Sequence, residues 1–364
     1  MTPWVGEPFS AALIHWQQAH GRQHLPWQHT GSAYKVWLSE IMLQQTQVST
    51  VLGYYARFLQ AFPTVQDLAN APDQQVMQLW AGLGYYSRAR NLHACAKEVV
   101  ARFGGEFPSH VKDLETLPGI GPSTAGAIAS LAHGIQAAIL DGNVKRVFCR
   151  YYGVEGHPEQ AAVKKQLWAI AHSNVPKAQP GVYNQALMDL GATCCVPRNP
   201  KCGQCPLRGS CVALEKGLTA QLPTPKPKKP RAELFFLSLL LQDSRGHWLL
   251  EFQANKGIWQ DLWAFPSVPC EPEPTRSNVA QACEAWLQSM GGVKQVELNP
   301  DALFDMLKAQ PWVVHELTHR KLHFKVVCLT LNEASAACVP LEDRPVPAVV
   351  HKLIAHRLEY CSTQ

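Results

Sequence analysis

Four cysteines in one short stretch of the chain have the chemistry to hold a single inorganic centre. The run CVPRNPKCGQCPLRGSC has the spacing C-x6-C-x2-C-x5-C and contains Cys195, Cys202, Cys205 and Cys211. Four thiolates can ligate a zinc ion or an iron–sulfur cluster. Structural zinc sites usually pair two C-x2–4-C knuckles, whereas this stretch has one C-x2-C between longer arms. Iron–sulfur clusters accept such uneven arms, so the spacing favours a cluster and leaves zinc open.

A second motif, LPGIGPSTAGAI at residues 117–128, has the composition of a tight turn between two helices. Gly119 and Gly121 permit backbone conformations closed to other residues, and Gly126 allows the helix that follows to pack closely. Backbone amides at a helix start can hold a phosphate oxygen, aided by the helix dipole. Such a contact reads no base, so the motif predicts sequence-independent binding of a nucleic-acid backbone. An ordinary helix–turn–helix corner is the alternative.

Hydrophobic spacing predicts the elements that must position these motifs. Up to about Leu214, apolar residues recur at three- and four-residue steps, which is typical of amphipathic helices. The segment LPTPKPKKPR at 222–231 holds four prolines and four basic residues and predicts a stiff, extended linker. Beyond the linker we expect strands at 234–241, 247–252 and 326–331, and a helix at 281–290.

Composition narrows the class of protein, its partner and its compartment. The 364 residues suffice for two domains, and the formal net charge of +5 mildly favours a polyanionic partner. No apolar run is long enough to span a bilayer, and the first residues lack the pattern of a secretory signal. With twelve cysteines and no export signal, we expect a reducing, cytoplasmic location, where clustered cysteines are more often metal ligands than disulfides.

The hairpin motif, the LDGNVKRV segment at 140–147 and the cysteine quartet together resemble the DNA glycosylase superfamily that includes endonuclease III. The segments SEIMLQQTQV at 39–48 and GLGYYSRARNL at 82–92 look like the adenine DNA glycosylases of the MutY type. The resemblance covers nearly the whole chain. It implies that the cysteine quartet holds one 4Fe–4S cluster.

The same resemblance implies a multidomain protein. An all-α helix-hairpin-helix glycosylase domain with its iron–sulfur loop is expected first, and an α+β Nudix-like lesion-recognition domain follows the linker. The expected bounds are 1–221 for the glycosylase domain (hairpin 117–128, loop 195–211), 222–231 for the linker and 232–364 for the second domain.

The resemblance assigns catalysis to two carboxyl groups. Adenine leaves poorly unless protonated and the sugar becomes oxocarbenium-like, so an acid and a carboxylate are needed, as in glycoside hydrolysis. Glu40 matches the general acid, and its apolar neighbours Trp37 and Ile41 would desolvate it and raise its pKa. Asp141 matches the residue that stabilises or captures the sugar cation, and Asn143 a polar partner that orients it. Without the resemblance, Glu40 would be a surface helix residue and Asp141 a turn or N-cap residue.

One hairpin position separates two kinds of glycosylase. Relatives that also cut the strand carry a lysine there, which forms a Schiff base with the opened sugar. The matching residue here is Ser123, which cannot do so. We therefore expect a monofunctional glycosylase. One alternative is a bifunctional pyrimidine-damage glycosylase, which Ser123 and the extra domain disfavour. The other is a non-enzymatic damage sensor, which the presence of Glu40 and Asp141 disfavours.

Other residues match positions at which the family contacts DNA. A glycosylase must take its base out of the stack and wedge the gap. Gln45 and Tyr85 match the family's wedge residues, and an aromatic ring can stack on a base. Core packing is the alternative for Tyr85. Lys145 is interpreted as a phosphate contact, like the amides of Gly119, Gly121 and Ser123 in the hairpin, although basic residues are often only solvated surface.

The C-terminal region resembles a Nudix domain in GIWQDLWAFP at 257–266. A working Nudix hydrolase also needs a glutamate-rich, metal-holding helix, which QACEAWLQSMGG at 281–292 lacks, so recognition without nucleotide hydrolysis is expected. Thr318 and His319 stand where the family commonly has Ser-His in its lesion-reading loop. The predicted substrate is double-stranded DNA with adenine opposite 8-oxoguanine or guanine, and we expect a monomeric, nucleoid-associated protein.

Overall fold

The computed structural model describes residues 8–226, 230–254, 257–291, 296–342 and 344–360. The chain divides into two compact units. The first comprises Met1–Ala71 with Arg90–Lys228, and the second Pro72–Ala89 with Lys229–Gln364. The second unit therefore includes a segment, 72–89, that lies well before the predicted linker in the sequence. Residues 227–229 of the predicted linker lie outside the described residues.

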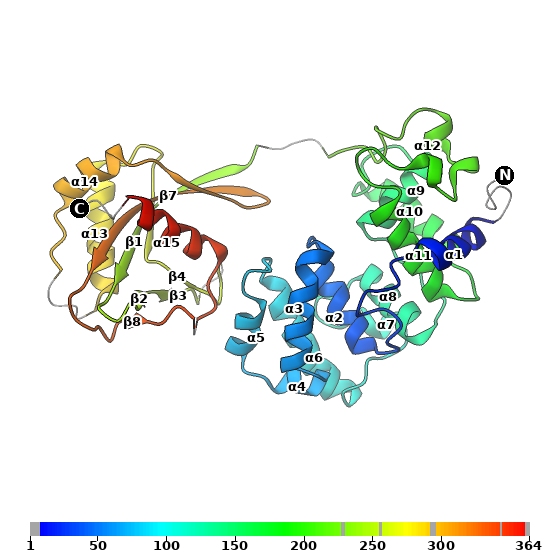
Figure 1. Ribbon diagram of the computed structural model, residues 1–364, viewed down its shortest axis with the longest axis horizontal. Helices are drawn as coiled ribbons and strands as arrows, with labels where there is room; N and C mark the ends of the chain where they lie inside the picture. The colour runs from blue at the N-terminus through cyan, green and yellow to red at the C-terminus, as the bar shows by residue number, and fades with distance from the viewer. Residues whose placement is uncertain (1–7, 227–229, 255–256, 292–295, 343, 361–364) are drawn as a thin grey trace. The chain divides into compact units, whose positions relative to one another are not determined.

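The first unit is built from helices and the loops between them (Figure 1). Its helices are α1 (Phe9–His20), α2 (Ala33–Leu43), α3 (Val48–Ala61), α4 (Val65–Asn70), α6 (Ser87–Phe103, which begins in the second unit), α7 (Val111–Leu114), α8 (Pro122–His133), α9 (Gly142–Tyr151), α10 (Ala161–Asn174), α11 (Pro180–Thr193), the 3-10 turns η1 (Cys202–Gln204) and η2 (Arg208–Ser210), and α12 (Val212–Glu215).

The apolar stripe across residues 37–55 belongs to two helices rather than one. Helix α2 begins behind the N-cap Ser32, whose side chain accepts a hydrogen bond from the Lys35 amide, and it ends at Leu43. Gln45, in the connection to α3, adopts a left-handed backbone with φ of 56°. A non-glycine residue rarely adopts this conformation, and the helix cannot continue through it. The break turns Gln45 out to the surface between the two helices.

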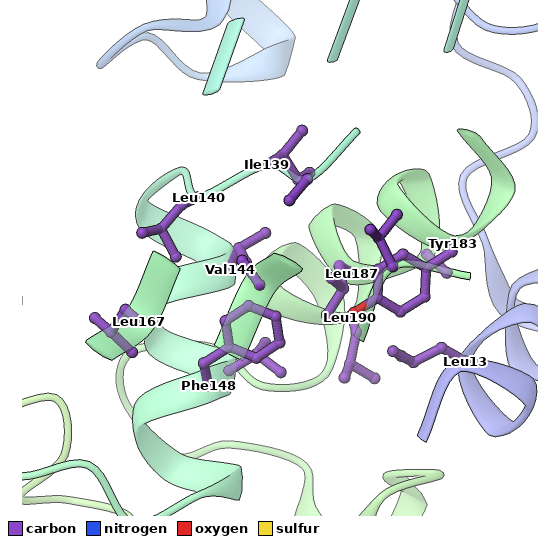
Figure 2. Packing of buried hydrophobic residues seen from close by; sticks show 14 of the residues in the cluster. Leu13, Ile139, Leu140, Val144, Phe148, Leu167, Tyr183, Leu187 and Leu190 are labelled. Carbon is purple, nitrogen blue, oxygen red and sulfur yellow. The ribbon is translucent and has the colours of Figure 1, made fainter. Parts of the chain in front are cut away.

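A hydrophobic core holds the helices around the hairpin together (Figure 2). Leu13 of α1, Phe148 of α9 and Leu167 of α10 are fully buried, and Tyr183 and Leu190 of α11 pack with them. Helix α8 approaches the neighbouring chain so closely that a Cβ on Gly126 would lie 2.0 Å from the Ala138 carbonyl oxygen. The expected close packing at Gly126 is therefore present, and it fixes the segment that leads into Asp141.

The second unit contains α5 and a mixed sheet with helices on both faces (Figure 1). Its elements are α5 (Asp73–Trp80), β1 (Ala232–Gln242), β2 (Trp248–Leu249), β3 (Glu251–Phe252), β4 (Trp263–Ala264), β5 (Ser267–Cys270), α13 (Arg276–Ser289), α14 (Pro300–Ala309), β6 (Val313–Glu316), β7 (Arg320–Thr330), β8 (Cys338–Val339) and α15 (Ala348–Tyr360). The strand order is β6-β7-β1-β2-β8, with β5 also paired to β1, and β3 and β4 form a separate ribbon.

Strand β1 runs through the middle of this sheet and is parallel to β7, from the pair Ala232–Arg320 to the pair Gln242–Thr330. Its side chains alternate between the two faces, as the pleat requires. Leu240 packs in the cluster that includes residues of α15, whereas Leu239 packs in the cluster formed with α13 and α14. Burial on both faces explains the unbroken apolar run of this strand.

The predicted strands and helix of this unit are present in the structure, but their bounds differ from those expected. The strand at 234–241 is β1, and the strand at 326–331 is the end of the longer β7. The run 247–252 forms two short strands, β2 and β3, that belong to different sheets. The helix begins earlier than expected, at Arg276, because Thr275 and Asn278 form a capping box. Among the described residues, no helix combines the length and the apolar character that a membrane span requires.

Candidate active site

A pocket of about 510 Å³ in the first unit is lined by Glu40. This volume is in the range of small-molecule sites. Its wall is rich in amide and aromatic side chains, including Gln17, Trp27, Gln28, Thr30, Gln179 and Gln185. Because Glu40 is the acidic side chain of this wall, an occupant of the pocket would lie beside a carboxyl group.

Burial, and to a smaller extent the negative charge of Asp141, raises the pKa of Glu40 to about 8. Glu40 lies on α2 with the fully buried Trp37 and Leu38 one turn before it, which explains the loss of hydration. The carboxyl group therefore keeps its proton near neutral pH, although the side chain borders the pocket. The influence of Asp141 means that two carboxyls a hundred residues apart in sequence interact in the folded unit.

Asp141 is the N-cap of α9, and one of its carboxylate oxygens accepts a hydrogen bond of 2.8 Å from the Val144 amide. Burial raises the pKa of Asp141, while the Val144 amide, the charge of Arg146 and the hydrogen bond from Asn143 lower it. These three contacts stabilise the ionised form. Desolvation is the larger effect, so the pKa of Asp141 is raised overall, like that of Glu40, and these contacts offset part of the rise. Asp141 is a helix cap, as its sequence context predicts, and its contact with Glu40 adds to that role.

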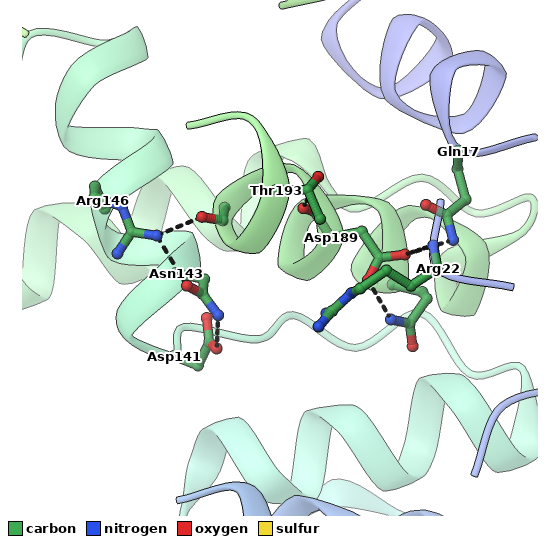
Figure 3. Close-up of polar contacts among 9 residues, drawn as sticks. Gln17, Arg22, Asp141, Asn143, Arg146, Asp189 and Thr193 are labelled. Carbon is green, nitrogen blue, oxygen red and sulfur yellow. Dashed lines mark hydrogen bonds and ion pairs between the residues drawn. The ribbon is translucent and has the colours of Figure 1, made fainter. Parts of the chain in front are cut away.

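Asn143 links Asp141 to Arg146 (Figure 3), and Arg146 in turn contacts the cysteine loop. Asn143 Nδ2 donates to Asp141 Oδ2 at 3.4 Å, and Arg146 Nη2 donates to Asn143 Oδ1 at 2.9 Å. Arg146 Nε donates in turn to the Cys195 carbonyl oxygen at 2.7 Å. The structure thus places Asn143 beside Asp141, where the sequence analysis expects an orienting partner.

The hairpin has the expected left-handed residue at Gly119, where φ is 75°. The expectation for Gly121 is wrong, because its φ of −93° and ψ of 175° describe extended backbone that other residues also adopt. Helix α8 begins at Pro122, and the N-cap Gly121 offers no side chain to the first amides. Ser123 Oγ accepts a hydrogen bond of 3.0 Å from the Leu140 amide, which ties α8 to the residue before Asp141.

The remaining residues predicted to contact DNA are spread over both units. Lys145 forms an ion pair with Glu159 in the first unit. Tyr85, in the second unit, is 39% exposed and has a left-handed backbone with φ of 49°. Its hydroxyl group hydrogen bonds with the Thr318 hydroxyl. Thr318 and His319 are exposed in the turn between β6 and β7, and they border a pocket that Tyr85 also lines.

The four cysteines of the quartet line one small cavity together with Arg150. Among the described residues, no three His, Cys, Asp or Glu side chains converge closely enough to ligate one metal ion. Arg150 Nη1 donates to Cys195 Sγ at 3.4 Å and to the Val196 carbonyl oxygen, and Nη2 donates to the Pro197 carbonyl oxygen. The donor set therefore fits a cluster.

Cys194 also borders the cavity, but its thiol donates to the Lys201 carbonyl oxygen at 3.4 Å. This contact agrees with its exclusion from the quartet.

Several polar residues around the Glu40 pocket were not found from the sequence. Gln185 of α11 lines the pocket, and Asp189, one turn later, is completely buried. Asp189 lies within the apolar segment 183–190, and a charged residue at a buried position needs polar partners. Its position in the sequence is therefore a signal that could have indicated a polar cluster. Gln17 and Gln28 carry no comparable signal in their local sequence.

Comparisons with known proteins identify the class and then the family. Residues 38–172 match the family described as the HhH-GPD superfamily base excision DNA repair protein, 195–211 match the iron-sulfur binding domain of endonuclease III, and 238–356 match the NUDIX domain. A solved thermostable thymine-DNA glycosylase is similar with a TM-score of 0.52 and 31% identity, over 57% of this chain and 95% of that one. The chain is a base excision DNA repair protein of the helix-hairpin-helix class.

Two relatives define the family more narrowly. The adenine DNA glycosylase of Buchnera aphidicola subsp. Baizongia pistaciae is 41% identical over 90% of this chain and 87% of its own length. The adenine DNA glycosylase of Homo sapiens is 36% identical over 89% of this chain and 67% of its own. This chain belongs to the adenine DNA glycosylase family. It is thus a base excision repair hydrolase with a 4Fe–4S cluster and a Nudix-like domain, which confirms the predicted fold class, enzyme class and cofactor.

Proposed function

We propose that this enzyme is a monofunctional glycosylase that hydrolyses the N-glycosidic bond of adenine paired with 8-oxoguanine, or with guanine, in duplex DNA. The observation that carries the proposal is the interaction of two buried carboxyl groups, Glu40, whose pKa is raised to about 8, and Asp141, whose anion is favoured by the Val144 amide, Arg146 and Asn143. Glycoside hydrolysis needs such a pair. The matches of Glu40, Asp141 and Asn143 to the family's catalytic residues support the same assignment.

In the proposed reaction, the extruded adenine enters the pocket that Glu40 lines. The protonated Glu40 carboxyl donates its proton to the base and so improves the leaving group. The Asp141 carboxylate stabilises the positive charge that develops on the sugar, and Asn143 holds this carboxylate in place. A water molecule then adds to the sugar carbon and its released proton restores the Glu40 carboxyl, which leaves free adenine and an intact strand with an abasic site.

Gln45 and Tyr85 are proposed to wedge into the duplex. Each is exposed and each has a left-handed backbone, with φ of 56° and 49°. Such conformations cost of order 1–3 kcal/mol in non-glycine residues and are concentrated at functional sites. The exposure and the backbone strain support a binding role rather than a packing role for both side chains, and they disfavour core packing for Tyr85.

Phosphate binding is assigned to the hairpin and the residues near it. The first amides of α8, behind Gly119 and Gly121, are oriented like those of other anion-binding helix starts. Ser123 lies at the same helix start, and Lys145 would exchange its ion pair with Glu159 for a phosphate. When bound by the four cysteines, the 4Fe–4S cluster supplies a rigid brace for the loop 195–211.

The second unit is proposed to recognise the lesion. The hydroxyl of Thr318 and the imidazole of His319 are exposed in one turn, where they can meet the edge of an oxidised base. Removal of residues 231–364 should reduce the preference for 8-oxoguanine over guanine opposite the target adenine. An unchanged preference would overturn the role of Thr318 and His319 and leave the catalytic assignment standing.

The decisive experiment measures single-turnover base loss from duplexes with adenine opposite 8-oxoguanine, guanine or thymine, with and without alkali. We expect excision from the first two substrates and strand breaks only after alkali. Borohydride should trap little protein on DNA, because Ser123 replaces the Schiff-base lysine. Strong trapping that depends on one lysine would overturn monofunctionality. A monomeric, cytoplasmic protein associated with the nucleoid remains our prediction, and sedimentation and cell fractionation test it.

A further inference from the structure

The turn at residues 82–85, which carries the proposed wedge residue Tyr85, has an unusual backbone at three of its four positions. Gly82, Gly84 and Tyr85 have φ of 90°, 75° and 49°, all in the left-handed region. Glycine adopts this region readily, whereas tyrosine does so only at a cost. The Tyr85 side chain is also exposed, although an aromatic ring is more stable when buried. Contacts within the fold must therefore keep Tyr85 in this conformation.

Arg88, in the first turn of α6, supplies such contacts from inside the second unit. It is 8% exposed, and its Nη2 donates to the carbonyl oxygens of Leu83 at 3.3 Å and of Gly84 at 3.1 Å. Its guanidinium carbon lies over the Tyr85 ring, 5.6 Å from the ring centre, which is within the range of a cation–π contact. One side chain thus contacts both the backbone of the turn and its aromatic ring.

Trp80 supports the same arrangement. Its Nε1 donates to the Gly84 carbonyl oxygen at 3.1 Å, so this oxygen accepts hydrogen bonds from two side chains. The guanidinium carbon of Arg88 also lies over the Trp80 ring, at 5.2 Å from its centre, and Trp80 is fully buried. Arg88 is therefore packed against a fixed part of the core, which restricts the positions open to the turn.

The location of Arg88 is unfavourable for a positive charge. Burial lowers its pKa to about 10, and the residue lies at the helix end where the dipole of α6 is positive. An apolar side chain of similar length would fill the same space without either cost. Packing alone therefore does not account for an arginine at this position, whereas its contacts with the turn do.

We propose that Arg88 is a positioning residue that keeps Tyr85 in the conformation that enters the duplex, by binding the carbonyls of residues 83 and 84 and by facing the Tyr85 ring. The inference rests on the proposed function, since it presupposes the wedge role of Tyr85. A side chain that is already in place loses less conformational freedom on binding. Preorganisation therefore raises the affinity for a duplex that the ring enters, and adds nothing for a duplex that it does not enter.

A double-mutant cycle on duplex binding tests this role. The probe duplex carries a non-hydrolysable 2′-fluoro-deoxyadenosine opposite 8-oxoguanine, and a fully paired duplex of the same length measures binding without the wedge. Arg88→Met should weaken binding to the probe by about 10-fold, within the contribution of one base–aromatic stack, and should change binding to the paired duplex by less than about 2-fold. Tyr85→Ala should weaken probe binding at least as much. In the Tyr85→Ala background, Arg88→Met should change probe affinity by less than about 2-fold.

The matched control is Arg102→Met, near the other end of α6. It also removes an arginine that lies over an aromatic ring, 5.0 Å from the centre of Phe103. If Arg88→Met does not fold, as judged by thermal unfolding, Arg88→Lys replaces it. Lysine keeps the positive charge but lacks the planar, forked guanidinium, so its effect on probe binding should show the same dependence on Tyr85.

The cycle separates positioning from a purely structural role. A general loss of stability lowers the affinity for both duplexes and adds to the effect of Tyr85→Ala. Additive effects, or an unchanged probe affinity in folded Arg88 variants, overturn the inference and leave the wedge role of Tyr85 standing. Normal probe affinity in Tyr85→Ala overturns the wedge role itself, and this inference with it, while base loss by the wild type still upholds the proposed chemistry.

Discussion

The guanidinium group of Arg146 donates a hydrogen bond to the backbone carbonyl of Cys195, with 2.7 Å between Nε and the oxygen. Its Nη2 donates to Asn143, and Asn143 donates to Asp141, so Arg146 links the cysteine loop to the proposed catalytic carboxylate. The position of the loop is thereby transmitted to Asp141 over three hydrogen bonds. We therefore expect the cysteine loop to influence the proposed chemistry, although its thiolates lie outside the carboxyl pair.

Arg146→Met should therefore slow excision while the cluster stays in place. The variant leaves Asn143 without its donor and removes a positive charge that favours the Asp141 anion. We expect the single-turnover rate at saturating enzyme to fall by about 10-fold or more, since charged hydrogen bonds are worth about 1.5–3 kcal/mol. Visible absorbance of the cluster checks the loop, and Arg102→Met on the surface of α6 is the control. A normal rate would show that the bridge has no catalytic effect.

Glu40→Gln should abolish excision and stabilise the fold at alkaline pH. The folded pKa of Glu40 is about 8, above its ordinary value of 4.5, so the native state holds a proton that the unfolded chain releases. Stability from this group is fully present below about pH 4.5 and is lost as the pH rises to about 8. Glutamine carries no such cost, so we expect the variant to gain on the order of 2 kcal/mol at pH 9.

Denaturant unfolding of wild type and Glu40→Gln at pH 5, 7 and 9 measures this difference, and exposed Glu98→Gln is the matched control. Excision by the wild type should fall above about pH 8, where Glu40 loses the proton it donates. Equal stability differences at the three pH values would contradict the raised pKa of Glu40.

Asp141 has two roles that two substitutions can separate. Asparagine is as good an N-cap as aspartate, so Asp141→Asn should keep the hydrogen bond to the Val144 amide and most of the stability. It lacks the negative charge, and we expect base loss to drop by about 100-fold or more while mispair binding persists. Asp141→Ala should lose the cap as well, at a cost of about 1 kcal/mol. Near-normal single-turnover rates in Asp141→Asn would remove Asp141 from the proposed chemistry.

The sequence alone predicts the elements of this fold well where the signal is local. The glycine-rich hairpin, the cysteine spacing and the apolar run of β1 each depend on neighbouring residues, and the structure contains all three. The expectation for Gly121 failed because a glycine pattern does not tell which residue needs the left-handed region. The helix break at Gln45 is not predicted by the sequence, because glutamine rarely adopts the left-handed conformation that Gln45 has in the structure.

The site depends on contacts that no local pattern encodes. Gln17 and Asp189 are 172 residues apart in sequence, and only the packing of α1 against α11 brings them together. The interaction of Glu40 with Asp141 likewise depends on the packing of α2 on α8, whose Ser123 is hydrogen bonded to the residue before Asp141. The roles proposed for these carboxyls come from family resemblance, whereas the contacts of Asp189 required the structure.

The two hairpin glycines should respond differently to alanine, and this difference tests the phosphate-binding proposal. Gly119 has φ of 75°, and an added Cβ would lie 2.8 Å from Asn91 Cβ, so Gly119→Ala should destabilise the fold by about 1–2 kcal/mol. Gly121 has an extended backbone and no atom within 4 Å of an added Cβ, so Gly121→Ala should change stability by less than about 0.5 kcal/mol.

Duplex binding should nevertheless weaken in Gly121→Ala, because the new methyl group stands at the start of α8 where a phosphate must approach the amides. Thermal unfolding and titration of a non-cleavable duplex separate the two effects. Gly142→Ala, at the first turn of α9 with open space around an added Cβ, is the control for an added methyl group at a helix start. Unaltered affinity in Gly121→Ala would place the phosphate contact elsewhere on the first unit.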